Sequence, residues 1–199
     1  MVFRAVGRGR LRPTGRRTAE SARLLDLRRD IAWDGLALED CFHATADRQR
    51  VRDEVFRYIS GQSLRIDATV FEKCKVKPHV QTPEYFYKLS WFSHFKKVGP
   101  AALRGATEAQ IVAASIGTKN RRKTIRLAVE DVVNQCIPNK TYSVAFWPAE
   151  SDPCLQIADY CTWAIQRALE QGDDRSYELI KPQISSLYDY FRFGTQKYY

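Results

Sequence analysis

Residues 153–171 read PCLQIADYCTWAIQRALEQ, and this stretch decides the fold because it has the pattern of one long helix. Asp152 is the expected N-cap, and Pro153 suits the first helical position. Apolar side chains recur at helical spacing and form a broad stripe, made of Cys154, Ile157, Ala158, Cys161, Ala164, Ile165 and Ala168. The pattern predicts a helix with one face in a core.

Asp159 is the anomaly of this helix, because it lies beside the apolar stripe. Asp is a poor residue for a helix interior, and removing its charge from water is costly unless it is paired or binds a metal. Two interpretations stay open: Asp159 binds a divalent cation, or it points outward and pairs with a surface Arg or Lys. Capping explains Asp152 fully, so we expect a structural role for it.

The composition is that of a globular chain. Its 199 residues are enough for one domain, no apolar run approaches the roughly 20 residues of a membrane span, and no secretory signal is visible. The five cysteines are odd in number and include no CxxC pair. A disulfide framework or zinc cluster is therefore not expected, and a reducing cytoplasm fits best.

The positive charge is unevenly distributed. The formal net charge is +9, but residues 1–17 hold six Arg and no acid, so the other residues carry only +3. A basic protein favours acidic partners such as nucleic acid. Residues 1–17 show no periodicity, and we interpret them as an unstructured basic arm before a single domain at 18–199.

Helix and strand patterns alternate along this domain. We expect helices at 18–33, 47–59, 82–97 and 153–171, and another that follows residues 119–123 and runs to about 136. Strands are expected at 64–71, 110–116 and 142–147. Gly99-Pro100 is expected to end the third helix. The alternation predicts an α/β fold in which helices cover a mostly buried sheet, with three or four strands.

Two further features have alternative interpretations. The aromatic helix from Tyr85 to Phe95 could stack on bases, although core packing is the more common use of such a run. The basic cluster Lys119, Arg121, Arg122 and Lys123 precedes a helix, where backbone N–H groups favour phosphate, but a solvated surface loop has the same composition.

The segment Leu155-Gln156-Ile157-Ala158-Asp159 resembles the C-terminal "LQ-x-AD" motif of domain-of-unknown-function family 3800. A second match is Phe42-His43-Ala44, which is similar to the "HA" motif that precedes the family's first long helix. The order of elements over residues 20–180 also fits. Members of this family are regarded as ribonuclease H-like, so the resemblance implies a mixed sheet flanked by helices.

The resemblance implies metal-dependent cleavage of nucleic acid phosphodiesters, with Mg²⁺ or Mn²⁺ held by carboxylates. It places Asp159 as a catalytic metal ligand, Glu39 as a second ligand, and His43 as a proton-transfer or orienting group. A lone histidine such as His43 is also often only a hydrogen-bonded structural residue. The basic cluster at 119–123 would contact phosphate.

One part of the family pattern is missing. The family begins with a strand bearing an Asp-Glu-Ser-Gly type motif, whereas this chain has no acid before Glu20. We therefore expect a sheet without its first strand and an impaired nuclease-like protein. The alternative is a non-catalytic module that binds nucleic acid or protein. For residues 1–17 we favour a wrong or shifted start over a functional basic arm that orders on binding.

Overall fold

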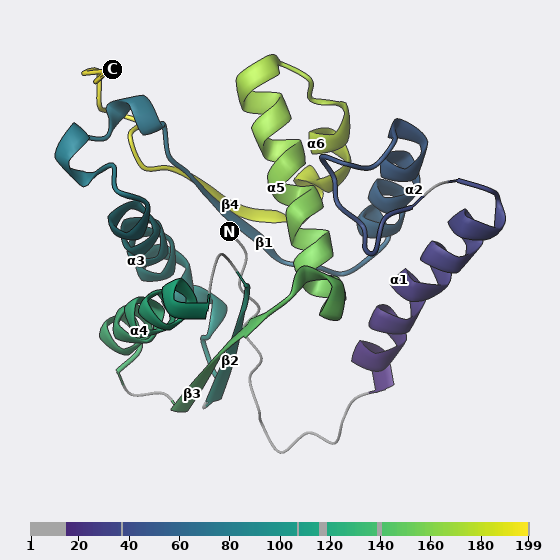
Figure 1. Ribbon diagram of the computed structural model, residues 1–199, viewed down its shortest axis with the longest axis horizontal. Helices are drawn as coiled ribbons and strands as arrows, with labels where there is room; N and C mark the ends of the chain where they lie inside the picture. Colours follow the sequence, from purple (N-terminus) through teal and green to yellow (C-terminus); the bar gives the residue numbers. More distant parts are fainter. Residues whose placement is uncertain (1–14, 37, 107, 116–118, 139–140, 199) are drawn as a thin grey trace. The chain divides into compact units, whose positions relative to one another are not determined.

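The computed structural model describes residues 15–36, 38–106, 108–115, 119–138 and 141–198, with the backbone alone for 15–21 and 119–122. Within this part of the chain it is an α/β structure with six helices and four short strands (Figure 1). The chain divides into two compact units, with boundaries at 66/67, 146/147 and 185/186. The expectation of a single domain at 18–199 stays a prediction, which this division does not test.

The first unit is helical and contains the candidate site. Its elements are α1 (Gly15–Trp33), α2 (Gln49–Ser60), α5 (Pro153–Gln171) and α6 (Arg175–Ile180). Helix α5 packs against α1 and α6, and α2 also packs against α1 and α6. The side chain of Gln183 donates to the carbonyls of Ile59 and Gln62, both at 2.8 Å. Because these carbonyls lie at the end of α2, Gln183 ties that end to the chain after α6.

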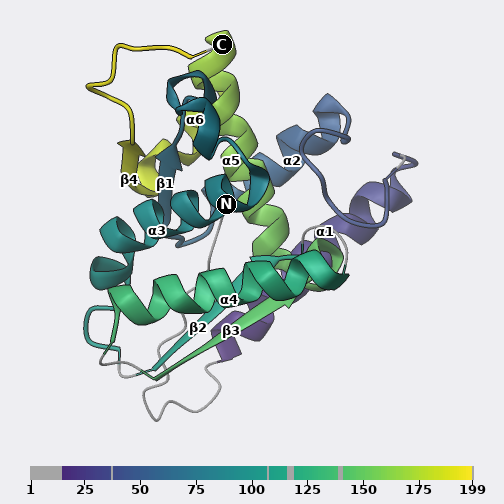
Figure 2. The ribbon, with the colours of Figure 1, turned by 60° about the vertical axis from the view of Figure 1, so that its left-hand side comes forward.

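The second unit combines helices and strands. Helices α3 (Pro83–Ala102) and α4 (Lys119–Cys136) lie side by side, and α4 runs along the strand pair β2–β3 (Figure 2). Arg126 of α4 donates to the Val144 carbonyl at 3.1 Å, which fixes the helix to β3. The strands are β1 (Ile66–Val70), β2 (Glu108–Ala114), β3 (Thr141–Trp147) and β4 (Ile184–Asp189).

The described strands form two parallel pairs, β1 with β4 and β2 with β3, and not one sheet. The sequence predicts the first three strands but not β4, because residues 184–189 mix serine with apolar residues and show no clear alternation. Among the described residues, no helix has both the length and the apolarity that a membrane span requires.

Local sequence explains where α2 and α5 begin and end. Helix α5 covers the predicted range, the Asp152 carboxylate accepts from Cys154 N at 2.7 Å, and Gly172 ends the helix with φ +67°. In α2 the four predicted core residues, Val51, Val55, Phe56 and Ile59, are all buried. These spacings place an apolar face of each helix in the core of the first unit.

The prediction that Gly99-Pro100 ends the third helix is wrong, because α3 continues to Ala102. A Cβ at Gly99 would lie 3.0 Å from the ring of Phe95, so the glycine allows close packing inside the helix. Proline after it removes one N–H, yet the Leu103 amide still bonds to the Gly99 carbonyl at 3.0 Å. Helix α1 also begins earlier than expected, so residues 15–17 are helical and not part of an arm.

Candidate functional site

Backbone amides of the turn at residues 42–47 donate hydrogen bonds to side chains of α5. Phe42 N donates to Gln156 Oε1 at 3.3 Å, and Ala44 N donates to Asp159 Oδ2 at 2.8 Å. Gln156 and Asp159 are three positions apart, so they lie on the same side of the helix. The polar residues of the LQ-x-AD segment thus hold the Phe42-His43-Ala44 segment.

A second carboxylate, that of Asp47, accepts a hydrogen bond from a backbone amide of the same turn. Asp47 is buried, and its Oδ2 accepts from His43 N at 2.8 Å and from the hydroxyl of the buried Tyr160. Burial, and then the bond to Asp47, raise the pKa of Tyr160 well above its usual range. The Tyr160 hydroxyl therefore stays protonated and donates to the buried Asp47. This arrangement joins α5 to the start of α2.

His43 and Asp159 form a pair at the edge of this network. His43 Nδ1 lies 3.3 Å from Asp159 Oδ2, and the two side chains are 52% and 39% exposed. Both are accessible to a ligand, unlike the neighbouring Asp47. A carboxylate beside one imidazole nitrogen orients the ring, and a half-exposed pair of this kind has the geometry of an acid–base pair.

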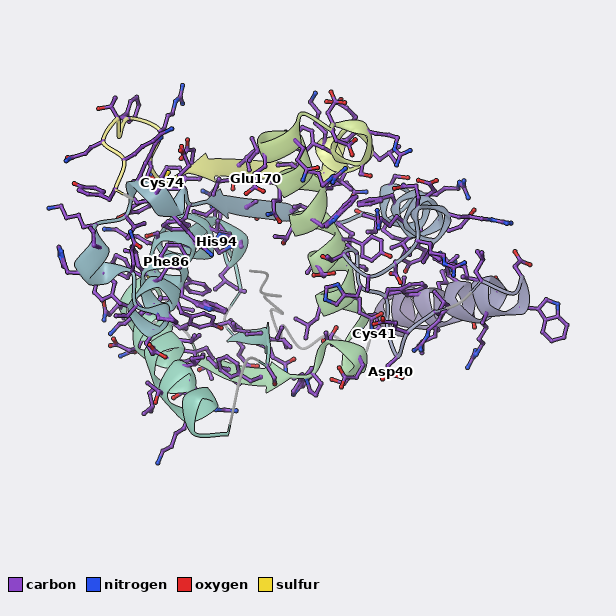
Figure 3. The ribbon with its side chains drawn as sticks, turned by 45° about the horizontal axis from the view of Figure 1, so that its top comes forward. Asp40, Cys41, Cys74, Phe86, His94 and Glu170 are labelled. Atoms are coloured by element: carbon purple, nitrogen blue, oxygen red, sulfur yellow. The ribbon has the colours of Figure 1, made fainter. Side chains whose placement is uncertain are left out.

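Cys41 lies just before this turn, next to Asp40 in Figure 3. Burial is the main cause that raises the pKa of the Cys41 thiol, and the charges of Glu150, Asp47 and Asp159 add to it, against an opposing effect of Arg28. A thiol with a raised pKa is a weak nucleophile at neutral pH. We therefore assign no chemistry to Cys41.

The other predicted site residues are not part of this group. The Glu39 side chain is exposed, and among the described residues no hydrogen bond or ion pair joins it to Asp159 or His43. In the basic cluster, Lys123 is exposed in α4. The side chains of Lys119, Arg121 and Arg122 lie outside the described part of the chain.

A two-metal site needs several carboxylates around shared ions. Within the described ranges, no group of three or more His, Cys, Asp and Glu side chains could hold a metal ion. Asp159 Oδ2 already accepts from Ala44 N and lies beside His43. The described residues therefore do not fit the Mg²⁺ or Mn²⁺ pair that the resemblance implies.

Sequence reasoning identified Asp159 and His43, but it missed the partners that position them. Gln156 belongs to the quoted motif, yet its role in binding Phe42 N depends on a turn 114 positions away. Asp47 was assigned only to the start of a helix. Asp47 lies just before the helix that begins at Gln49, and an Asp in such a position often bonds to nearby backbone amides. This position is the one feature of the sequence that indicates its role in the turn.

Comparison of the chain with protein-family models, with curated proteins and with solved structures gives no significant match.

Proposed function

We propose that the chain is a nucleic-acid-binding protein with a ribonuclease H-like fold, and that it is impaired in the metal-dependent hydrolysis of its parent family. The observation that carries this proposal is the direct contact between the two segments that resemble the family. Ala44 and Asp159 are 115 positions apart in sequence and are joined by a hydrogen bond. This contact supports the proposal because it brings together the two segments that carry the resemblance.

Charge supports nucleic acid as the partner. The chain has a net charge of +9, and phosphate contacts from Lys and Arg supply most of the sequence-independent affinity for nucleic acid. In the first unit, the exposed side chain of His43 is a hydrogen-bonding group that a phosphate could reach. In the second unit, the basic cluster at 119–123 begins α4, where backbone N–H groups also favour phosphate.

Active phosphodiester hydrolysis with Mg²⁺ or Mn²⁺ is the second candidate function. The half-exposed His43–Asp159 pair favours it, because such a pair can move a proton to or from a reacting group. The described donor set falls short of a two-metal site, so we derive no hydrolytic step from it. Non-catalytic binding is therefore the function we place first.

Fluorescence anisotropy with labelled DNA and RNA, in Mg²⁺, Mn²⁺ and EDTA, tests the proposal, and gel analysis of the same samples detects cleavage. We expect binding that falls with salt, persists in EDTA and leaves the strands intact. Absence of binding would contradict the proposal. Asp159→Asn keeps an acceptor for Ala44 N but removes the charge, and Asp152→Asn is the matched control on the same helix. Hydrolysis would be established by metal-dependent cleavage that Asp159→Asn abolishes and that Asp152→Asn does not change.

A further inference from the structure

The segment at residues 188–198, YDYFRFGTQKY, contains five aromatic and two basic side chains and belongs to the second unit. It begins in β4 and is fixed at both ends. Tyr190 N donates to the Val70 carbonyl at 3.0 Å, and Tyr198 N donates to the Cys74 carbonyl at 2.5 Å. Figure 3 shows Cys74 beside this segment. Residues 191–197 therefore form a loop held across the end of β1.

Aromatic rings on the inner side of this loop form a cluster around Phe71. The Phe71 ring stacks on Tyr190, with centroids 4.8 Å apart, and meets Phe86 and Phe191 edge-on at 5.7 and 6.1 Å. These rings belong to three separate segments of the unit, so the cluster gives the loop a rigid base. Tyr190 remains 37% exposed although it is stacked.

The outer side of the loop presents an aromatic ring with no packing role. Phe193 is 90% exposed, at the turn that the bond from Gly194 N to the Phe191 carbonyl closes. The guanidinium of Arg192 lies 5.6 Å from the Phe193 ring centroid. A flat ring with a cation beside it matches what a nucleotide offers, a π-face and a phosphate.

The charges around the loop are positive. Its two nearby acids have structural partners: Glu72 bonds to Lys75, and Asp189 accepts from Phe191 N at 2.9 Å. Among the residues described, no acidic side chain pairs with the exposed Lys73, Lys77, Arg192 or Lys197. These four cations lie on the loop or on the segment around Cys74 to which it is bonded, so this part of the unit carries exposed positive charge.

From this arrangement we infer that the loop at 190–198 is a binding surface for single-stranded nucleic acid, with Phe193 and Tyr190 stacking on bases and Arg192, Lys73 and Lys197 contacting phosphates. The inference rests on the proposed function and names the form of nucleic acid that is bound. Bases in a duplex are stacked on each other and hide their faces, whereas an unpaired base can stack on an exposed ring. The surface therefore prefers single strands over duplexes.

Anisotropy titration of the full chain with a labelled oligothymidylate and a mixed-sequence duplex of equal length tests the inference. Replacing Phe193 by Leu keeps an apolar side chain but removes the π-face, and we expect about tenfold weaker binding of the single strand, as for the loss of one stacked base. Phe193→Trp should restore it. Arg192→Gln should lower the slope of log affinity against log salt by about 0.7, the value for one phosphate contact on a single strand.

Trp33→Ala is the matched control, because Trp33 is 91% exposed but lies on α1 of the other unit. It should bind the single strand as the wild type does. The inference would be overturned if Phe193→Leu bound the single strand with wild-type affinity, or if the wild type bound strand and duplex equally well. In either case nucleic-acid binding remains, and so does the proposed function. If the proposed function fails together with the inference, neither the single strand nor the duplex binds. Self-association that Phe193→Leu abolishes, without strand binding, would instead assign the loop to a protein contact.

Discussion

At the scale of single residues, Asp159 shows how hydrogen bonding supports a carboxylate in a helix interior. Its Oδ2 accepts from the backbone N–H of Ala44, a residue with no exposed surface, and lies near the imidazole of His43. A carboxylate that accepts a backbone N–H gains a charge-assisted hydrogen bond in place of water. The N–H gains as well, since a buried amide without an acceptor is costly.

Replacing Asp159 by Ala should therefore destabilise the protein even in the absence of any ligand. The Ala44 amide would lose its acceptor, and we expect the free energy of unfolding to fall by about 1–3 kcal/mol. Asp159→Asn retains an oxygen at the same place and should lose less than half of that. Urea unfolding at neutral pH measures both. Equal stability of Asp159→Ala and wild type would show that the turn does not depend on this bond.

His94 of α3 provides a pH-dependent contribution to stability. It is buried in the second unit with its Nδ1 2.9 Å from Thr69 Oγ1 of β1, and burial lowers the pKa of His94 to about 4. The unfolded chain, with an ordinary histidine pKa near 6.5, binds a proton at higher pH than the folded chain does. Acidification from pH 6.5 to 4 therefore favours unfolding, by roughly 3 kcal/mol for a shift of this size.

Unfolding midpoints of wild type and His94→Gln between pH 7 and 4 test this contribution. The variant should lose less stability on acidification than the wild type does. His79→Gln is the control, because His79 is exposed in the same unit. Parallel pH profiles for wild type and His94→Gln would exclude His94 as the source of the acid sensitivity.

At the scale of elements, the amphipathic helices were predictable because their ends and their buried faces follow local rules. Helix α5 has an Asp-Pro start, a glycine end and one apolar stripe, and its bounds match the prediction. Helix α3 departs from the prediction because it continues through Gly99 and Pro100 to Ala102, with Gly99 packed under the ring of Phe95 one turn earlier in the same helix. The partner of Asp159 was equally unpredictable, since it is a backbone amide that only the folded turn presents.

The glycines that follow α5 and α2 make a matched test of helix termination. Gly172 has φ +67°, which L side chains adopt with strain, whereas Gly61 has φ −82° and only ordinary contacts around a Cβ. Gly172→Ala should lower the free energy of unfolding by about 1 kcal/mol, and Gly61→Ala should change it by a few tenths at most. Thermal unfolding of the two variants compares them directly. Equal effects would show that the left-handed conformation is not what Gly172 contributes.

At the scale of the whole molecule, each unit is assembled from segments that are distant in sequence. Among the described residues, the first unit joins 15–66 with 147–185, and the second joins 67–146 with 186–198. Strand β4 pairs with β1 although more than a hundred residues separate them. Composition and periodicity predict such elements one at a time, and they carry no information on which distant segments pair. This is why β4 and its pairing with β1 escaped prediction, while β1 itself, α2 and α5 were predicted.

The interleaved connectivity predicts that the units do not unfold independently. Three chain crossings link them, and the boundaries at 66/67 and 185/186 fall inside β1 and β4, so loss of the β1–β4 pair would free segments of both. Pulsed hydrogen exchange along a urea gradient, read by mass spectrometry, should show peptides from α5 and from α4 losing protection at the same midpoint. That result would support the single domain expected at 18–199. Separate midpoints for the two helices would establish two domains instead, because cooperative unfolding of one unit would then leave the other intact.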